Sequence, residues 1–414
     1  MTEAFIVATA RSPIGRARKG SLVDLRPDDL AAQMVAAALA AVPGLDPARV
    51  EDLLMGCGQP AGEQGNNLAR IVAVLLGLDG VPGTTVNRYC SSSLQTTRMA
   101  FHAIKAGEGD VFVSAGVESV THYDRGAADV TPGVDVRNPR FAESWARTDA
   151  RAGGEASDPA VPLRPWHDPR DDGALPDPYI AMGQTAENVA ELMGVTRAEQ
   201  DEFAARSQQR AERAIASGFW AREITPVTLP DGRIVDADDG PRAGVTVEAL
   251  AGLDPVFRAD GTVTAGNCCP LNDGAAAVVV VSERIVDELG LQPLARIVST
   301  GVSALSPEIM GLGPVDASRQ ALARAGLSID DIDLVELNEA FAAQVIPSAR
   351  ELGIDPERLN VHGGAIAVGH PFGMTGARIT STLLNGLAAT GGRYGLETMC
   401  VGGGQGMAMV VERV

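Results

Sequence analysis

Apolar and polar positions follow the same order twice along this chain. Residues 28–56, DDLAAQMVAAALAAVPGLDPARVEDLLMG, show a helical apolar period, a Gly-Leu-Asp break, a short acidic turn and an apolar run typical of a strand. Residues 316–338, DASRQALARAGLSIDDIDLVELN, repeat that order. Further along, Cys90 and the strand VFVSAGVES correspond to His370 and the strand in ETMCVGGGQGMAMVV. We therefore expect two similar halves.

Both halves alternate helix and strand signals, which predicts α/β layers with mostly parallel strands and helices on both faces. We place the first half at residues 1–121, completed by about 272–292, and the second half at 293–414. Between them, residues 122–271 have a different character, and we expect them to form an inserted loop domain over a site made by the two halves.

The inserted segment itself has two parts. The run DPAVPLRPWHDPRDDGALPDPY is rich in Pro and Asp and lacks apolar periodicity, which is typical of an irregular lid. Thr196 and Glu199 then have the spacing of a capping box at the start of an amphipathic helix.

Composition narrows the possible partners. Of 414 residues, 45% are apolar and 21% charged, and the net charge of -19 argues against nucleic acid or an anionic membrane as a partner. The apolar runs AAQMVAAALAAV and AAAVVVV are too short for membrane insertion, and the first residues lack the features of a signal peptide. Abundant Ala, Gly, Val and Arg indicate a bacterial source, so we expect a cytoplasmic protein.

The five cysteines lie at positions 57, 90, 268, 269 and 400, without a C-x-x-C pair. An odd number in this pattern indicates neither a disulfide framework nor a zinc site, and we expect no metal. Cys90 is the candidate nucleophile: a strand that ends at Val86 and a helix that begins among Ser91 to Ser93 place its thiol at a helix N-terminus. There the helix dipole would lower the pKa of the thiol. The alternative is a small buried apolar residue.

His370 is the candidate base. In GGAIAVGHPFGMTGAR, Pro371 holds it in extended geometry and the surrounding glycines allow tight turns. A satisfied core histidine is the alternative, but the repeat places His370 opposite Cys90.

CVGGGQG at 400–406 has no following helix, so a dinucleotide site is excluded there. Its glycines can instead present N–H groups to an oxyanion, or simply form a tight turn beside a buried Cys400. Asn338, in NEAFA, follows the repeat strand DLVEL and alone is uninformative.

Together these stretches resemble the thiolase family over essentially the whole chain: N-x-x-C at Asn87–Cys90, NEAFA at 338, GHPFGMTG at 369 and CVGGGQG at 400, in the family's order. ATARSPIG, MGQTAENVA, TAGNCCPLNDGAA and MGLGPV are similar too. The resemblance implies duplicated βαβαβαββ halves in an α/β/α/β/α arrangement with an inserted loop domain. It also implies coenzyme A and acyl-CoA as substrates, with no permanently bound cofactor.

The resemblance also implies roles. His370 would take the proton of Cys90, which attacks the acyl carbonyl and becomes a thioester, and Cys400 would act as acid and base on acetyl-CoA. Asn338, through a water, and His370 would serve one oxyanion, and the N–H groups of Cys90 and Gly402 the other. The pantetheine arm would pass a set of residues on the loop domain and nearby: Met182, Cys268, Cys269, Ala340 and Phe341.

The chain departs from the family pattern in three places, which involve four residues. Ser93 replaces the usual Gly and would reshape the neighbouring pocket. Ala181 replaces the His of many biosynthetic acetoacetyl-CoA members, which favours a degradative enzyme. Cys268 and Cys269 stand where Ser or Ala is common.

We expect a thiolase that cleaves 3-ketoacyl-CoA, reversibly, in fatty-acid or related acyl-CoA degradation. A biosynthetic acetoacetyl-CoA thiolase is the alternative. A decarboxylating ketoacyl synthase would generally lack a counterpart of Cys400, and a noncatalytic acyl-CoA or lipid carrier would be expected to lose Cys90, His370 or Cys400. The family further suggests a homodimer or homotetramer.

Overall fold

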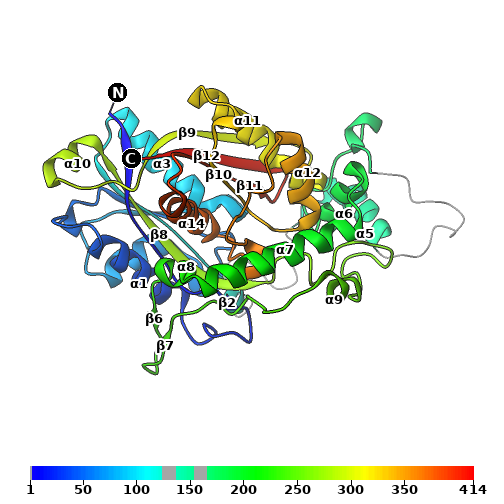
Figure 1. Ribbon diagram of the computed structural model, residues 1–414, viewed down its shortest axis with the longest axis horizontal. Coiled ribbons are helices and arrows are strands. Elements are labelled where there is room, and N and C mark those ends of the chain that lie inside the picture. Colours follow the sequence, from blue (N-terminus) through cyan, green and yellow to red (C-terminus); the bar gives the residue numbers. More distant parts are fainter. Residues whose placement is uncertain (1, 124–136, 153–165) are drawn as a thin grey trace, which may run out of the picture.

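The computed structural model describes residues 2–123, 137–152 and 166–414. The residues of the predicted first half form the strands and helices that come first along the chain, together with β8 and α10 (Figure 1). Its elements are β1 (Ala4–Arg11), β2 (Gly15–Arg16), α1 (Pro27–Ala40), β3 (Asp52–Gly56), α2 (Leu68–Leu75), β4 (Gly83–Val86), α3 (Ser92–Ala106), β5 (Val111–Ser119), β8 (Asn272–Ser282) and α10 (Glu283–Leu289).

The second half repeats much of that order. A short 3-10 helix precedes both β3 and β10, at Pro47–Arg49 and Ile329–Asp331, as the repeat predicts. The elements of this half are β9 (Ala295–Ala304), α11 (Gly313–Ala325), β10 (Leu334–Leu337), α12 (Ala342–Leu352), α13 (Ala365–Val368), α14 (Thr375–Thr390), β11 (Tyr394–Val401) and β12 (Gln405–Arg413).

The strands follow the order β10-β11-β12-β9-β1-β8-β5-β3-β4, with β2 on β8. β1 and β9 pair through only two residue pairs, Phe5 with Arg296 and Ile6 with Ala295, so each half has its own sheet joined at this point. The predicted predominance of parallel strands is wrong. β3 pairs in parallel with β4 and β5, and β10 with β11, whereas the pairings of β8, β9 and β12 are antiparallel.

Burial of alternate residues on β8 and β12 shows the layers. On β8, Val279 packs against α1 and α2, and its neighbour Val278 faces α3 and α14. On β12, Met409 faces the same two helices, and Val410 packs against α11 and α12. The order is therefore helices, sheet, α3 with α14, sheet, helices, which confirms the expected α/β/α/β/α arrangement (Figure 1).

The remaining elements lie in the proposed insertion, 122–271. The capping box at Thr196 and Glu199 is confirmed, with the Thr196 hydroxyl accepting the Glu199 N–H. The predicted lid falls partly on residues 153–165, outside the described part of the chain; its remainder contains a short 3-10 helix at Pro169–Asp172. The helices and strands here are α4 (Val120–Tyr123), α5 (Ala142–Ala152), α6 (Met182–Met193), α7 (Arg197–Ala216), α8 (Phe219–Glu223), β6 (Val227–Thr228), β7 (Ile234–Val235) and α9 (Val247–Ala251).

No helix within the described residues combines the length and apolar character needed to cross a membrane.

Candidate active site

Cys90 lies in a tight turn between β4 and α3, as the sequence predicts. β4 ends at Val86, a 3-10 turn spans Tyr89–Ser91, and α3 begins at Ser92. Tyr89 adopts a left-handed φ of 42°, and the Asn87 side chain accepts its N–H at 2.8 Å. The Ser92 hydroxyl donates to the Tyr89 carbonyl at 2.7 Å. These two bonds hold the turn that carries the thiol.

His370 is held by its backbone and by its ring. Its N–H donates to the Asn272 side-chain oxygen at 2.9 Å, at the start of β8. Its Nδ1 lies 2.6 Å from the Thr375 hydroxyl, and its Nε2 lies 3.3 Å from Nδ2 of Asn338. The ring is almost fully buried and makes an edge contact with Phe372 at 5.3 Å between centroids.

Asn338 lies directly after β10, where its N–H donates to the Thr398 carbonyl at 3.0 Å. Its side-chain oxygen is buried and has no hydrogen-bond partner among the described residues. A buried amide oxygen in this state is suited to hold a water or a substrate donor beside His370. The sequence left Asn338 uninformative by itself, and the structure places it against the histidine.

Cys400 and Gly402 reach the site from the turn between β11 and β12. Cys400 is fully buried near the end of β11. Two residues later, Gly402 lines the same cavity as Cys90, and its N–H lowers the pKa of the Cys90 thiol. The two sulfurs are close enough for the charge of a Cys90 thiolate to raise the pKa of Cys400. The turn therefore brings a second thiol and an N–H donor to the candidate nucleophile.

The predicted low pKa of Cys90 is wrong. Burial raises the pKa of its thiol to about 12, although the Gly402 N–H acts in the opposite direction. Burial also raises the pKa of Cys400, well above its ordinary value. Burial, with the nearby Arg378 charge, lowers the pKa of His370 to about 3. The proton therefore rests on sulfur, and the imidazole is neutral.

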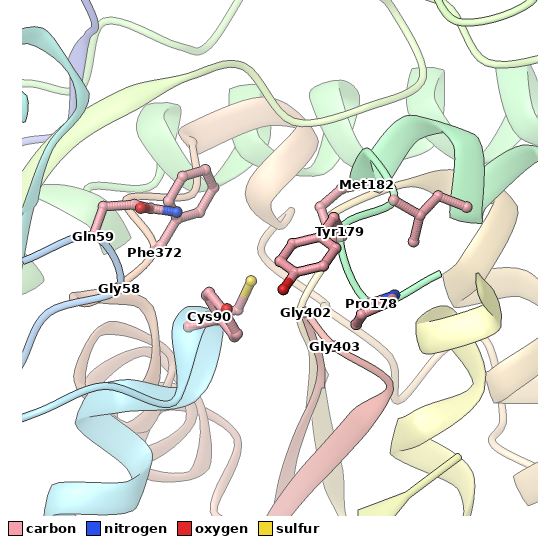
Figure 2. Close-up of a pocket in the computed structure, with 11 residues that line it drawn as sticks. Gly58, Gln59, Cys90, Pro178, Tyr179, Met182, Phe372, Gly402 and Gly403 are labelled. Carbon is pink, nitrogen blue, oxygen red and sulfur yellow. The ribbon is translucent and has the colours of Figure 1, made fainter. Parts of the chain in front are cut away.

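A cavity of about 260 Å³ opens onto Cys90 (Figure 2). Its sulfur points into the space between Gln59 and Phe372 on one side and Tyr179 and Met182 on the other. The lining combines aromatic and apolar groups with uncharged polar ones. The described lining residues are Gly58, Gln59, Tyr89, Cys90, Pro178, Tyr179, Ile180, Met182, Phe372, Gly402 and Gly403.

The other predicted CoA-contact residues gather around Cys400. The backbones of Cys268 and Phe341 pair as an isolated antiparallel β-bridge, and the Cys269 N–H donates to the Ala340 carbonyl at 3.0 Å. These residues and Met182 belong to the apolar cluster that contains Cys400. Met182 is also the first residue of α6 and lines the cavity. No contact with CoA is established by this arrangement, so their role stays a prediction.

Ser93 does not reshape the pocket as expected. It is fully buried, and its hydroxyl accepts the Ala377 N–H at 2.9 Å. This bond joins α3 to α14, the two helices of the middle layer, and Ser93 is absent from the described cavity lining.

Sequence reasoning missed Glu118, the last residue but one of β5, which connects the loop after β3 to the turn after His370. Its carboxylate accepts the N–H groups of Gly58 and Gly373 at 2.8 Å each, the Gln59 N–H at 3.1 Å and the Gln64 amide at 2.7 Å. Glu118 is fully buried. A charged residue within the apolar run VFVSAGVES was the available signal.

Family models match both halves of the chain. The model described as "Thiolase, N-terminal domain" matches residues 4–156 and 168–284, and "Thiolase, C-terminal domain" matches residues 291–413.

Curated relatives are similar over the full length. A beta-ketoadipyl-CoA thiolase of Pseudomonas aeruginosa is 44% identical, with 100% of this chain and 99% of the relative covered. A 3-ketoacyl-CoA thiolase of Bacillus subtilis is 41% identical, with 100% of both covered. Among solved structures, the Bacillus anthracis acetyl-CoA acetyltransferase superposes with a TM-score of 0.84 at 38% identity, covering 100% of this chain and 99% of that one. Human mitochondrial 3-ketoacyl-CoA thiolase gives 0.84 at 35% identity, with the same coverage.

Proposed function

Since this chain belongs to the thiolase family, whose members are acyltransferases acting on CoA thioesters, we propose that it cleaves 3-ketoacyl-CoA with CoA. The products are acetyl-CoA and a shortened acyl-CoA. One observation carries this proposal: Cys90 and Gly402 line the same cavity, so that the motif around Cys90 and the motif around Cys400 meet at one point.

In the first step, Cys90 attacks the 3-keto carbonyl while its proton passes to Nε2 of His370. Since the Cys90 thiol and the His370 imidazole are both neutral, this proton moves as the new carbon–sulfur bond forms, rather than beforehand. In this proposal, the N–H groups of Gly402 and Cys90 receive the oxyanion that develops on the attacked carbonyl.

The C2–C3 bond of the substrate then breaks, and the acyl group remains on Cys90 as a thioester. The departing acetyl-CoA enolate takes its proton from Cys400, with its oxygen received by His370 and a water on Asn338. The thiol of CoA next attacks the thioester and gives its proton to Cys400, which had lost one to the enolate. The shortened acyl-CoA leaves, Cys90 regains its proton from His370, and the cycle closes.

We propose acyl-CoA degradation as the physiological role, of fatty acids or of related chains. Two relatives' names favour different chains: a keto acid that ends in a carboxylate for beta-ketoadipyl-CoA thiolase, and a broader class for 3-ketoacyl-CoA thiolase. The alternative is acetoacetyl-CoA synthesis, favoured by the superposition on an acetyl-CoA acetyltransferase. We also propose a homodimer or homotetramer, since β4 is an edge strand and Val74 and Leu75 on the adjacent α2 are exposed.

The test is CoA-dependent thiolysis of acetoacetyl-, 3-ketohexanoyl-, 3-ketoadipyl- and 3-ketopalmitoyl-CoA, followed by loss of the enolate absorbance. Cys90→Ala should lower turnover at least about 10³-fold, because the acyl group loses its covalent carrier. Ser91→Ala, which removes the neighbouring hydroxyl, serves as the matched control and should keep turnover. Retained turnover in Cys90→Ala would remove the proposal.

Cys400→Ala separates the two half-reactions. Mass spectrometry should still find an acyl group on Cys90 after exposure to an acyl-CoA, whereas exchange of the α-protons of acetyl-CoA should stop. Unchanged proton exchange would contradict the role of Cys400.

A further inference from the structure

The hydroxyl of Thr375 contacts one ring nitrogen of His370, and the amide of Asn338 lies near both. Nδ1 lies 2.6 Å from the Thr375 hydroxyl oxygen, and the amide nitrogen of Asn338 lies 3.3 Å from Nε2 and 3.5 Å from Nδ1. The Thr375 hydroxyl in turn donates to the carbonyl of Pro371 at 2.7 Å. Thr375 is fully buried at the first position of α14.

These contacts determine where the ring proton lies. A hydroxyl has one hydrogen, and that of Thr375 is engaged with Pro371, so its oxygen faces Nδ1 as an acceptor. Nδ1 must then carry the hydrogen. Nε2 is left with a lone pair. The amide nitrogen of Asn338 lies near both ring nitrogens, so the contact with Thr375 is the one that sets the tautomer.

The opposite tautomer would break the contact with Thr375. With hydrogen on Nε2, Thr375 would have to release Pro371 to donate to Nδ1. The Asn338 amide accommodates either tautomer, because its nitrogen lies near both ring nitrogens and its oxygen has no other partner among the described residues. Thr375 is thus the group that opposes the exchange.

We propose that Thr375 is a positioning residue that holds His370 in the Nδ1–H tautomer and so keeps Nε2 as the acceptor of the Cys90 proton. The inference rests on the proposed function for the role of His370, but the tautomer itself does not. A hydroxyl here does what a carboxylate does for the histidine of a serine protease, without adding a negative charge.

The absence of a negative charge fits the surroundings of the ring. A carboxylate at Nδ1 would favour an imidazolium, whereas a hydroxyl accepts the N–H of a neutral ring. Arg378 lies on α14, three residues after Thr375, and its guanidinium is buried in the core. The nitrogens of this guanidinium have no hydrogen-bond partner among the described residues. Its charge, after burial, is the second cause that keeps the pKa of His370 low. Thr375 selects the tautomer, and Arg378 opposes a second proton.

Two variants separate positioning from packing. Thr375→Val keeps the branched shape but cannot accept from Nδ1, and Thr375→Ser keeps the hydroxyl. Loss of one buried acceptor should lower kcat about 10- to 100-fold in Thr375→Val, with little change in KM, because substrate contacts remain. Thr375→Ser should recover most of that loss.

The direct readout is the ¹⁵N spectrum of the imidazoles, which distinguishes a protonated from an unprotonated ring nitrogen. The chain has five histidines, and His370 is assigned by its absence from the His370→Gln spectrum. We expect hydrogen on Nδ1 in the unaltered protein and in Thr375→Ser, and an increased Nε2–H population in Thr375→Val.

Hydrogen on Nε2 in the unaltered protein would overturn the proposal, even if Thr375→Val failed to fold. An unchanged tautomer and unchanged kcat in Thr375→Val would overturn it as well. If the unaltered protein cleaved no 3-ketoacyl-CoA, the proposed function would fail, and the spectrum would still decide the tautomer.

Discussion

Replacing Glu118 with Gln should weaken the protein and its active site together. One carboxylate oxygen accepts the N–H groups of Gly58 and Gly373, and the other accepts Gln59 and Gln64. The amide of a Gln has one oxygen and one NH₂ group. In either orientation of the new amide, two donors lose their acceptor and face another donor.

The size of the effect follows from that pair. A buried donor without a partner costs roughly 1–3 kcal/mol, so we expect Glu118→Gln to lower the free energy of unfolding by about 2–6 kcal/mol. Turnover should fall as well, since Gly58 lines the cavity and Gly373 belongs to the turn after His370.

Urea unfolding followed by the fluorescence of the three tryptophans measures the first quantity, and thiolysis the second. Glu108→Gln is the control, because Glu108 is exposed in the turn after α3; its effect should stay within about 0.5 kcal/mol. A loss below about 1 kcal/mol in Glu118→Gln would refute the reasoning that this carboxylate holds the loop after β3 and the turn after His370 together.

Three further outcomes are expected. The pKa of Cys90 is raised to about 12, so its reactive thiolate form should increase roughly tenfold per pH unit from pH 6 to 9. The rate of alkylation of Cys90 by iodoacetamide, measured by mass spectrometry of the peptide that contains it, should rise by the same factor. A plateau below pH 8 would contradict this. Burial raises the pKa of Glu397 to about 8, so the folded state keeps a proton that the unfolded chain releases above its ordinary value of 4.5. That contribution to stability is present below pH 4.5 and is lost as pH rises to 8; Glu397→Gln should therefore make unfolding less sensitive to pH in this window, and an unchanged pH profile would count against it. Ser93→Gly leaves the Ala377 N–H without its acceptor and adds a helix glycine, so it should lower stability by about 2 kcal/mol with kcat little changed, and a large loss of kcat at unchanged stability would assign Ser93 to the site instead.

The sequence predicted the framework well because its main signals are local. The repeat placed Cys90 and His370 opposite each other, and each lies just before one helix of the middle layer, α3 and α14. The prediction of mostly parallel strands failed, because β8 is a continuous apolar run that is buried on both faces, and such a run does not reveal that its partners are antiparallel.

The prediction of a low pKa for Cys90 failed for a similar reason. The helix N-terminus was visible in the sequence, but the depth of burial depends on the β11–β12 turn and the loop domain, which come from distant parts of the chain. Glu118 and Thr375 were missed because their partners are set by tertiary contacts. Met182 was predicted through the family resemblance, whereas the lining residues Pro178, Tyr179 and Ile180 lie in or directly after a Pro-rich run without periodicity, so no pattern placed them.

The residues that line the cavity come from two different parts of the fold, here called the floor and the roof. The floor, which includes Cys90, is continuous with the middle helical layer, so changes there alter folding and chemistry at once. The roof, Pro178 to Met182, comes from the proposed insertion and has no share in the sheets. New acyl preferences can therefore arise by exchanging roof residues while the reacting groups keep their places, and directed evolution for altered chain length should begin at these positions.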